Sequence, residues 1–243
     1  MDLYPPNIAR GMRRCAIMSS VRFKGLKRVK KDKREITSSL THLAGALAAL
    51  TGTIKLACGA FGRGGTAAFA SVLIFGISMV LLYSTSSIYH CCCAVGARAA
   101  RFMQRLDHIA IFLLIAGTYT PICVVALGYP LGYVMLSLVW GAAAAGLIMK
   151  IFWMRAPLWL SCALYVAMGW IAAFFVVPIA RALTASEMAW LIAGGLLYTA
   201  GAFIFGFERP RLRISWFGSH ELFHLFVIGG SLCHYITVAK CLA

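Results

Sequence analysis

The sequence predicts an all-α integral membrane protein, a bundle of seven transmembrane helices. Of its 243 residues, 61% are hydrophobic and only 12% are charged. Several apolar runs reach the roughly 20 residues that a helix needs to cross the hydrocarbon core of a bilayer. The alternating ten-residue segments of outer-membrane barrels do not occur in the sequence, so the spanning elements are predicted to be helices.

Seven apolar spans follow one another along the chain, separated by glycine, proline and charged residues. Their expected ranges are about 38–60, 66–90, 107–127, 131–152, 157–180, 186–207 and 219–241. Residues 38–243 thus form one seven-helix domain, and residues 1–37 form a basic amino-terminal arm. No feature of the sequence specifies an oligomeric state.

The chain is strongly basic, with 23 Lys and Arg against 7 Asp and Glu. In a membrane protein an excess of basic residues indicates which loops face the cytoplasm. It therefore gives no reason to expect a nucleic acid as a partner. All but four of the basic residues fall in the arm or in the second, fourth and sixth loops, the fourth-loop pair being Lys150 and Arg155. The positive-inside rule then predicts a multi-pass protein of the plasma (cytoplasmic) membrane, with its amino terminus inside and its carboxyl terminus outside. The arm is expected to lie against anionic headgroups.

The six histidines lie in or beside the predicted spans, where ionisable groups are costly and usually functional. His220 and His224 are one helical turn apart at the start of the seventh span, so their rings share one face. His90 ends the second span, and the topology brings it to the same depth of the inner leaflet. Three imidazoles with an open fourth position are typical of catalytic zinc. We therefore expect His90, His220 and His224 to bind Zn²⁺.

Two further polar residues are predicted at this depth. Asp107 begins the third span, and its carboxylate is placed to hold a water molecule and take its proton. Ser86 precedes His90 by one helical turn and faces the same way, so its hydroxyl can orient a ligand or a substrate carbonyl. Glu35 and His42, at the entry of the first span, are on the same side of the membrane.

Residues 220–224 also match the H-E-x-x-H pattern of zinc proteases, in which the Glu is the general base. Glu221 lies about 100° round the helix from His220, so it need not face the metal. His234 is about 15 Å deeper than His224 and does not fit the spacing of a third protease ligand. His108 points to a different face from Asp107 and is expected to make a structural hydrogen bond. The pattern therefore favours a membrane site over a peptidase.

Four motifs occur in order along the chain: Glu35-Ile-Thr-Ser38-x3-His42, Ser86-x3-His90, Leu106-Asp107-His108-Ile-Ala-Ile-Phe-Leu-Leu-Ile-Ala-Gly117-Thr-Tyr-Thr-Pro121 and Phe217-Gly218-Ser219-His220-Glu-Leu-Phe-His224. With these motifs the chain resembles the hemolysin III branch of the progestin and adipoQ receptor family over almost its whole length after the basic arm. Ser38 stands where many members carry Asn. The resemblance implies seven helices with an inside amino terminus. It also implies zinc held by His90, His220 and His224, with Asp107 and Ser86 around it.

Two functions fit these features. In the first, a zinc-bound water attacks an amide or ester bond of an amphiphilic lipid, with Asp107 as the base. Eukaryotic members of the family resemble intramembrane ceramidases, which favours a lipid amide as the substrate. In the second, zinc is structural and clamps spans two, three and seven together in a receptor-like or cytolytic protein that is not an enzyme.

Overall fold

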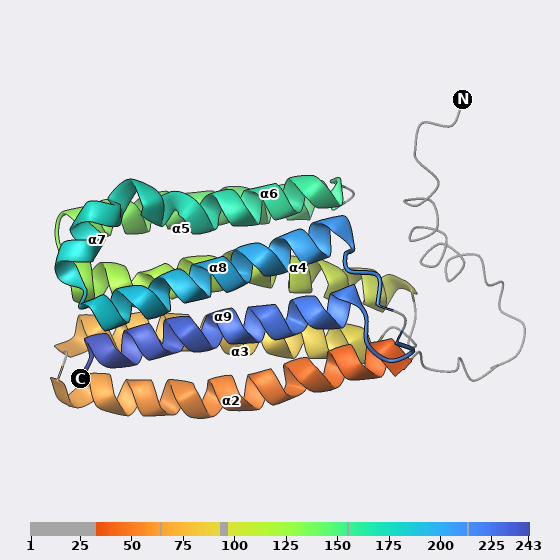
Figure 1. The fold of residues 1–243 in the computed structure, drawn as a ribbon, viewed down its shortest axis with the longest axis horizontal. Coiled ribbons are helices and arrows are strands. Elements are labelled where there is room, and N and C mark those ends of the chain that lie inside the picture. Colours follow the sequence, from red (N-terminus) through yellow and green to blue (C-terminus); the bar gives the residue numbers. More distant parts are fainter. Residues whose placement is uncertain (1–32, 64, 93–96, 155, 213) are drawn as a thin grey trace, which may run out of the picture.

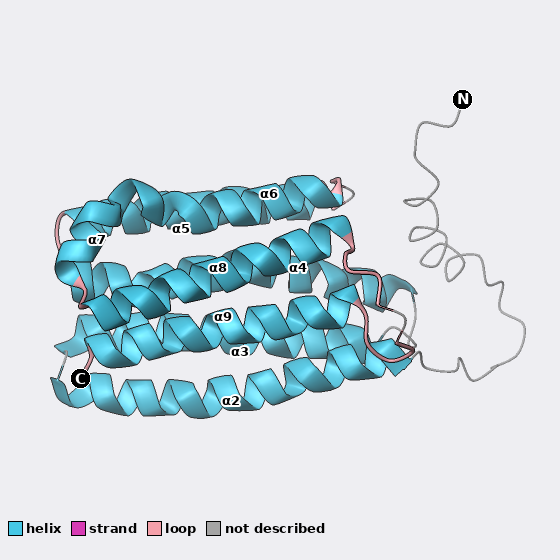
Figure 2. Ribbon diagram, viewed as in Figure 1, coloured by secondary structure: helices cyan, strands magenta, loops and turns pink. Residues whose placement is uncertain are grey.

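The computed structural model describes residues 33–63, 65–92, 97–154, 156–212 and 214–243, and these residues form helices and short connections without a strand (Figure 2). The greater part of the predicted arm, residues 1–32, lies outside the described residues, and its last residues begin the first helix. In chain order the elements are α2 (Lys33–Arg63), α3 (Gly65–Cys92), α4 (Ala97–Pro121), the π-helix η1 (Ile122–Leu127), α5 (Leu131–Phe152), α6 (Leu158–Gly169), the 3₁₀-helix η2 (Trp170–Phe175), α7 (Val176–Ala182), α8 (Ala185–Phe207) and α9 (Ser219–Cys241).

Seven segments of the described chain are long and apolar enough to cross a membrane, which confirms the predicted fold class. The fifth segment, Leu158–Ala182, combines α6, η2 and α7, and the third, Arg98–Leu127, combines α4 with η1. The predicted boundaries hold to within a few residues except at the start of the third segment. There α4 begins at Ala97, ten residues before the predicted start, because a helix can continue past the hydrocarbon with charged side chains such as Arg98 and Arg101.

The long helices run along one common direction, with α4 in the interior (Figure 1). One core cluster joins α2, α3 and α9 around Phe75, and a second joins α4 to α5 and α6 around Phe112 and Met135. Residues of α4 belong to both clusters, which makes this helix the centre of the bundle. The start of α2, the end of α3, the start of α4 and the start of α9 lie at the same end of the bundle (Figure 1). We call it the histidine end.

Small residues let the central helices approach closely, as is typical of helix pairs in lipid. A side chain at Gly146 of α5 would collide with the ring of Phe112, and one at Gly117 of α4 would collide with Ser78 of α3.

Pro121 adds a second local feature, at the end of α4. The chain changes from α-helix to π-helix after Pro121, because proline cannot donate the next backbone hydrogen bond.

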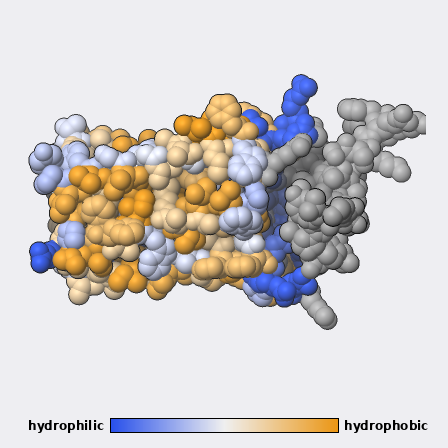
Figure 3. Space-filling view, turned by 90° about the horizontal axis from the view of Figure 1, so that it is seen from above, coloured by the Kyte–Doolittle hydropathy of each residue, from blue (hydrophilic) through white to orange (hydrophobic). Residues whose placement is uncertain are grey.

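The outer surface of the bundle is apolar along its length, and hydrophilic side chains gather at the histidine end (Figure 3). Large apolar residues such as Leu47, which is 60% exposed, face outward from the spans. A continuous apolar surface of this kind indicates contact with lipid. The molecule is therefore a multi-pass membrane protein, whereas the assignment of its two ends to the two sides of the membrane stays a prediction.

Lys150 differs from its predicted place in the fourth loop. It lies within α5, is only 1% exposed, and donates a hydrogen bond of 2.6 Å from Nζ to the hydroxyl of Ser161 on α6. The charge count treated this lysine as a topological signal at the membrane surface. Its long side chain instead turns inward, toward a hydroxyl on the neighbouring helix.

Candidate metal centre

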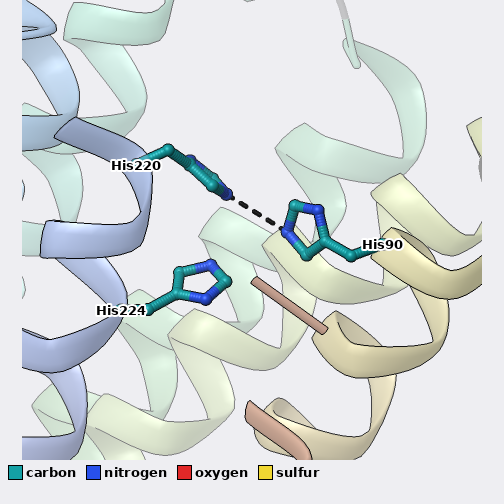
Figure 4. Close-up of side chains that lie close together, drawn as sticks. All are labelled: His90, His220 and His224. Atoms are coloured by element: carbon teal, nitrogen blue, oxygen red, sulfur yellow. Dashed lines mark hydrogen bonds between the residues drawn. The ribbon is translucent and has the colours of Figure 1, made fainter. Parts of the chain in front are cut away.

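Three histidines from two helices converge at the histidine end. One ring nitrogen of each can be chosen so that all three lie within 4.8 Å of one another. Nε2 of His90 and Nε2 of His220 are 3.1 Å apart, and the ring of His224 faces the same point from one turn further along α9 (Figure 4). The structure thus brings together the three residues that the sequence predicted as metal ligands.

Local helix geometry explains this convergence. His90 lies in the last turn of α3, and His220 is the second residue of α9. His224 follows His220 by four residues, which stacks the two rings on one face with centroids 4.6 Å apart. The ring centroid of His90 lies 5.0 Å from that of His220 and 5.2 Å from that of His224.

Glu35 supports His90 from the side away from the other histidines. One carboxylate oxygen of Glu35 lies 2.8 Å from Nδ1 of His90. This contact leaves Nε2, the other ring nitrogen, directed at His220. Metal-bound histidines usually donate their second N–H to a carboxylate, which fixes the ring and its tautomer. No role for Glu35 was predicted, although one signal was available: Glu35 is an acidic residue on the same side of the membrane as the histidines.

His224 is held by α2 through two contacts. Its Nδ1 lies 3.4 Å from the hydroxyl of Thr41, and its ring stacks on His42 with centroids 3.6 Å apart and an interplanar angle of 8°. His42 therefore touches the site through a ring contact, although it is outside the group of three convergent histidines. Helix α2 thus restricts the ring of His224 at the centre.

Asp107 and Ser86 lie beside the three histidines, as the sequence predicted. Asp107 lies near both the Ser86 hydroxyl and the His90 ring, and its carboxyl group interacts electrostatically with them. Ser86 is buried and Asp107 is half-buried, and both line the cavity that the histidines face. The arrangement places one carboxyl group next to the histidines without making it a member of the convergent group.

Glu221 turns away from the centre and closes the start of α9. Its two carboxylate oxygens accept hydrogen bonds from the Ser38 hydroxyl at 2.7 Å and from the backbone N–H of Gly218 at 2.6 Å. The residue is 2% exposed. Glu221 thus joins α9 to α2 and caps its first turn, which agrees with the expectation that it does not face the metal.

The two remaining histidines are separate from the centre. The backbone carbonyl of His108 accepts a hydrogen bond from the Tyr165 hydroxyl, but Nδ1 of its ring has no hydrogen-bond partner among the described residues. This nitrogen therefore does not make the structural hydrogen bond expected of His108, which stays a prediction for the rest of the ring. His234 is buried on α9, ten residues beyond His224, and the prediction that it is too deep for the same ion agrees with its place.

The centre opens into a cavity of about 1180 Å³ that runs inward between the helices. Polar groups at its histidine end include Glu35, Asp107 and the three histidines, and apolar side chains dominate the rest of the wall. Some wall residues also belong to the outer surface: Trp170 is 49% exposed, Ile192 50% and Leu196 54%. The cavity therefore reaches the lipid-facing surface between η2 and α8.

The donor set fits a transition-metal ion. Imidazole nitrogens suit zinc, copper, iron and nickel, and their usual bond of 2.0–2.1 Å to zinc places the ligand atoms of a tetrahedron about 3.3 Å apart. The separation of 3.1 Å between Nε2 of His90 and Nε2 of His220 is close to this value. The contact of the partly exposed Glu35 carboxylate with Nδ1 of His90 is the kind of outer support that metal-bound histidines usually have.

Comparison with known proteins agrees with the motifs. Residues 31–235 match the model of the family described as Haemolysin-III related. The chain is 36% identical to "Hemolysin-3" of Bacillus cereus over 206 residues, which is 85% of this chain and 90% of the relative. It is 32% identical to "Hemolysin-3 homolog" of Bacillus subtilis (strain 168) over 206 residues, which is 85% and 93% of the two chains. A more distant relative is "ADIPOR-like receptor IZH2" of Saccharomyces cerevisiae, 24% identical over 165 residues, or 61% of this chain and 52% of the relative. With its seven spans and its matched motifs, this chain belongs to the Haemolysin-III related family.

Proposed function

We propose that this chain is a membrane-embedded, zinc-dependent hydrolase that cleaves an acyl bond, an amide or an ester, in an amphiphilic lipid. One observation carries the proposal above all: a group of three histidines with an adjacent carboxyl group opens directly into a large, mainly apolar cavity. A site for soluble substrates would not need an apolar chamber inside the bilayer. A lipid, by contrast, can place its reactive bond at the polar end and its chain along the apolar wall.

The three histidines would hold the ion. His90, His220 and His224 supply one nitrogen each, and three neutral ligands leave a coordination position open. When bound, zinc supplies Lewis acidity, polarising a carbonyl and lowering the pKa of water toward about 7. Glu35 acts here as a positioning residue, because its contact with Nδ1 keeps Nε2 of His90 directed at the centre.

Asp107 would carry the proton transfers. Its carboxyl group borders the cavity beside the histidines, and it can accept a proton from an attacking water and pass it to the leaving nitrogen or oxygen. Ser86, which lies beside this carboxyl group, would orient it as a hydrogen-bond partner.

The substrate would enter from the bilayer. The cavity reaches the surface between η2 and α8, where Nε1 of Trp170 donates a hydrogen bond of 3.1 Å to the hydroxyl of Thr199 across the opening. A lipid that enters between these elements keeps its chain out of water throughout. The polar end of the cavity would lie in the cytoplasmic leaflet of the plasma membrane, where the basic residues of the histidine end meet anionic headgroups.

The test is hydrolysis of a lipid amide and of the matching ester by the purified full-length chain in nanodiscs with zinc. We expect turnover by the wild type and a loss of at least about a hundredfold for Asp107→Asn, with zinc content unchanged. Ser86→Ala should lower turnover, whereas Ser87→Ala, the same change at a residue that bonds to Ser39 on α2, should have a much smaller effect. Absence of turnover on both substrates by the zinc-loaded wild type would contradict the proposal.

A structural role for the ion is the second candidate function. His90 lies on α3 and both other histidines lie on α9, so an ion bound between them would join two helices that are far apart in the chain. A membrane-perturbing protein would fit the name of the relative from Bacillus cereus, "Hemolysin-3". Retention of cytolytic or other function in Asp107→Asn, together with a large loss of thermal stability on zinc removal, would favour this candidate.

A further inference from the structure

A second polar site lies deep in the same cavity, far from the metal centre. His234 of α9, Tyr198 of α8 and Thr118 of α4 all line the cavity wall. His234 is ten residues beyond His224 on one helix, which places it about 15 Å further along the cavity. We call these three residues the deep subsite.

Hydroxyl groups form a continuous chain behind this subsite. The Tyr198 hydroxyl lies 2.8 Å from the Ser231 hydroxyl, and the Tyr83 hydroxyl donates to the same Ser231 oxygen at 2.6 Å. Three linked hydroxyls, those of Tyr83, Ser231 and Tyr198, thus fix the Tyr198 ring, and Tyr198 lines the cavity.

His234 contributes an imidazole with one ring nitrogen that makes no hydrogen bond among the described residues. The residue is 5% exposed, and its Nδ1 has no partner among the described residues. Its ring lies 5.2 Å from the Tyr198 ring and packs over Gly194 of α8, where a side chain would come within 2.8 Å of Nε2. A buried polar group without a hydrogen bond is costly, so a ligand that supplies one would be preferred over a ligand that does not.

The charge of the cavity wall determines which chemical group of a ligand the deep subsite can bind. Of the described residues that line it, Arg34 alone is a lysine or arginine, and it lies at the histidine end. A carboxylate or phosphate at the deep subsite would be a buried charge without a cationic partner, which is strongly unfavourable. A hydroxyl group is neutral and can both donate and accept, and it therefore matches an imidazole and a phenol together.

From these observations we infer that the cavity binds an acyl chain that carries a hydroxyl group part-way along its length, recognised by His234 and Tyr198. The inference rests on the proposed function for the position of the reacting acyl end at the histidines. The separation of about 15 Å then sets where the hydroxyl must be: near the middle of a long chain and far from its carbonyl end. The deep subsite would thus recognise both the presence of a hydroxyl group on the acyl chain and its position along that chain.

The experiment compares stearic acid with two hydroxylated forms, one with the hydroxyl near the middle of the chain and one with it beside the carboxyl group. Native mass spectrometry of the zinc-loaded, full-length chain gives a dissociation constant for each acid without any need for turnover. We expect the wild type to bind the mid-chain hydroxy acid about tenfold more tightly than stearic acid, the gain from one buried hydrogen bond that is otherwise unmade. The isomer hydroxylated beside the carboxyl group should show no such gain.

Tyr198→Phe and His234→Leu should each reduce this preference to less than about threefold, while binding of stearic acid is retained. Tyr235→Phe is the matched control, since it removes a hydroxyl from the residue next to His234 without changing the wall of the cavity; it should keep the full preference. Equal binding of the acids by the wild type, as expected if water satisfies His234, overturns the inference and leaves the proposed function standing. Absence of binding by all three acids overturns both, and a preference without turnover on any lipid contradicts the hydrolase alone.

Discussion

The carboxylate of Glu35 lies 2.8 Å from Nδ1 of His90, on the side of the imidazole opposite the other two histidines. This contact joins the start of α2 to the end of α3 at the point where the candidate metal centre forms. It also fixes which nitrogen of His90 is available to an ion. The orientation of the first ligand thus depends on a residue that is itself not a ligand.

Glu35→Gln should weaken zinc binding about 10- to 100-fold without unfolding the chain, because an amide replaces the carboxylate that orients and polarises the ring. The measurement is a zinc titration against a chelator of known affinity. Glu208→Gln, the same change at an exposed residue at the end of α8, should leave zinc affinity unchanged. Equal affinities for the wild type and Glu35→Gln would show that the carboxylate does not support the ligand.

Glu221→Ala should lower thermal stability and leave the zinc content unchanged. The substitution removes the acceptor for the Ser38 hydroxyl and the Gly218 N–H, a loss of about 2 kcal/mol in the free energy of unfolding. Thermal melting with Ser38→Ala and the double variant gives the coupling between the two side chains. If Glu221→Ala instead abolished turnover at unchanged melting temperature, the H-E-x-x-H reading with Glu221 as the base would be correct.

His42→Phe should keep one zinc ion per chain. The ring stacks on His224, and neither of its nitrogens has a hydrogen-bond partner among the described residues, so phenylalanine can reproduce the contact. His42→Ala removes the stacked ring and should weaken zinc binding by allowing His224 to move. Loss of zinc from His42→Phe as complete as from His224→Ala would make His42 a fourth ligand.

Much of the fold followed from the sequence because it depends on simple quantities. Run length and charge spacing were enough to predict seven spans, and the alternation of spans was enough to bring His90, His220 and His224 to one depth. The contact between Glu35 and His90 could not be predicted in this way, because it depends on the rotation of α2 and α3 about their own axes. Lys150 was misplaced for a related reason: a charge near the end of a span can reach outward or inward, and only the presence of Ser161 on the neighbouring helix decides between them.

Lys150→Met should be neutral or stabilising, since methionine fills a similar volume and removes a buried charge. Ser161→Ala should destabilise the chain by about 1–3 kcal/mol, because it takes away the hydroxyl that accepts the hydrogen bond from the ammonium group. Thermal melting of both variants and of the double variant checks this, with the double variant close to Lys150→Met alone. A strongly destabilised Lys150→Met would mean that the charge is needed where it lies.

The metal content of the purified chain tests the central claim most directly. Elemental analysis of the wild type, His90→Ala, His220→Ala and His224→Ala should give one zinc ion per chain in the wild type and much less in each variant. His234→Ala, the matched control on the same helix as two of the ligands, should retain the full amount. Equal zinc in the wild type and in His224→Ala would contradict the assignment of this centre.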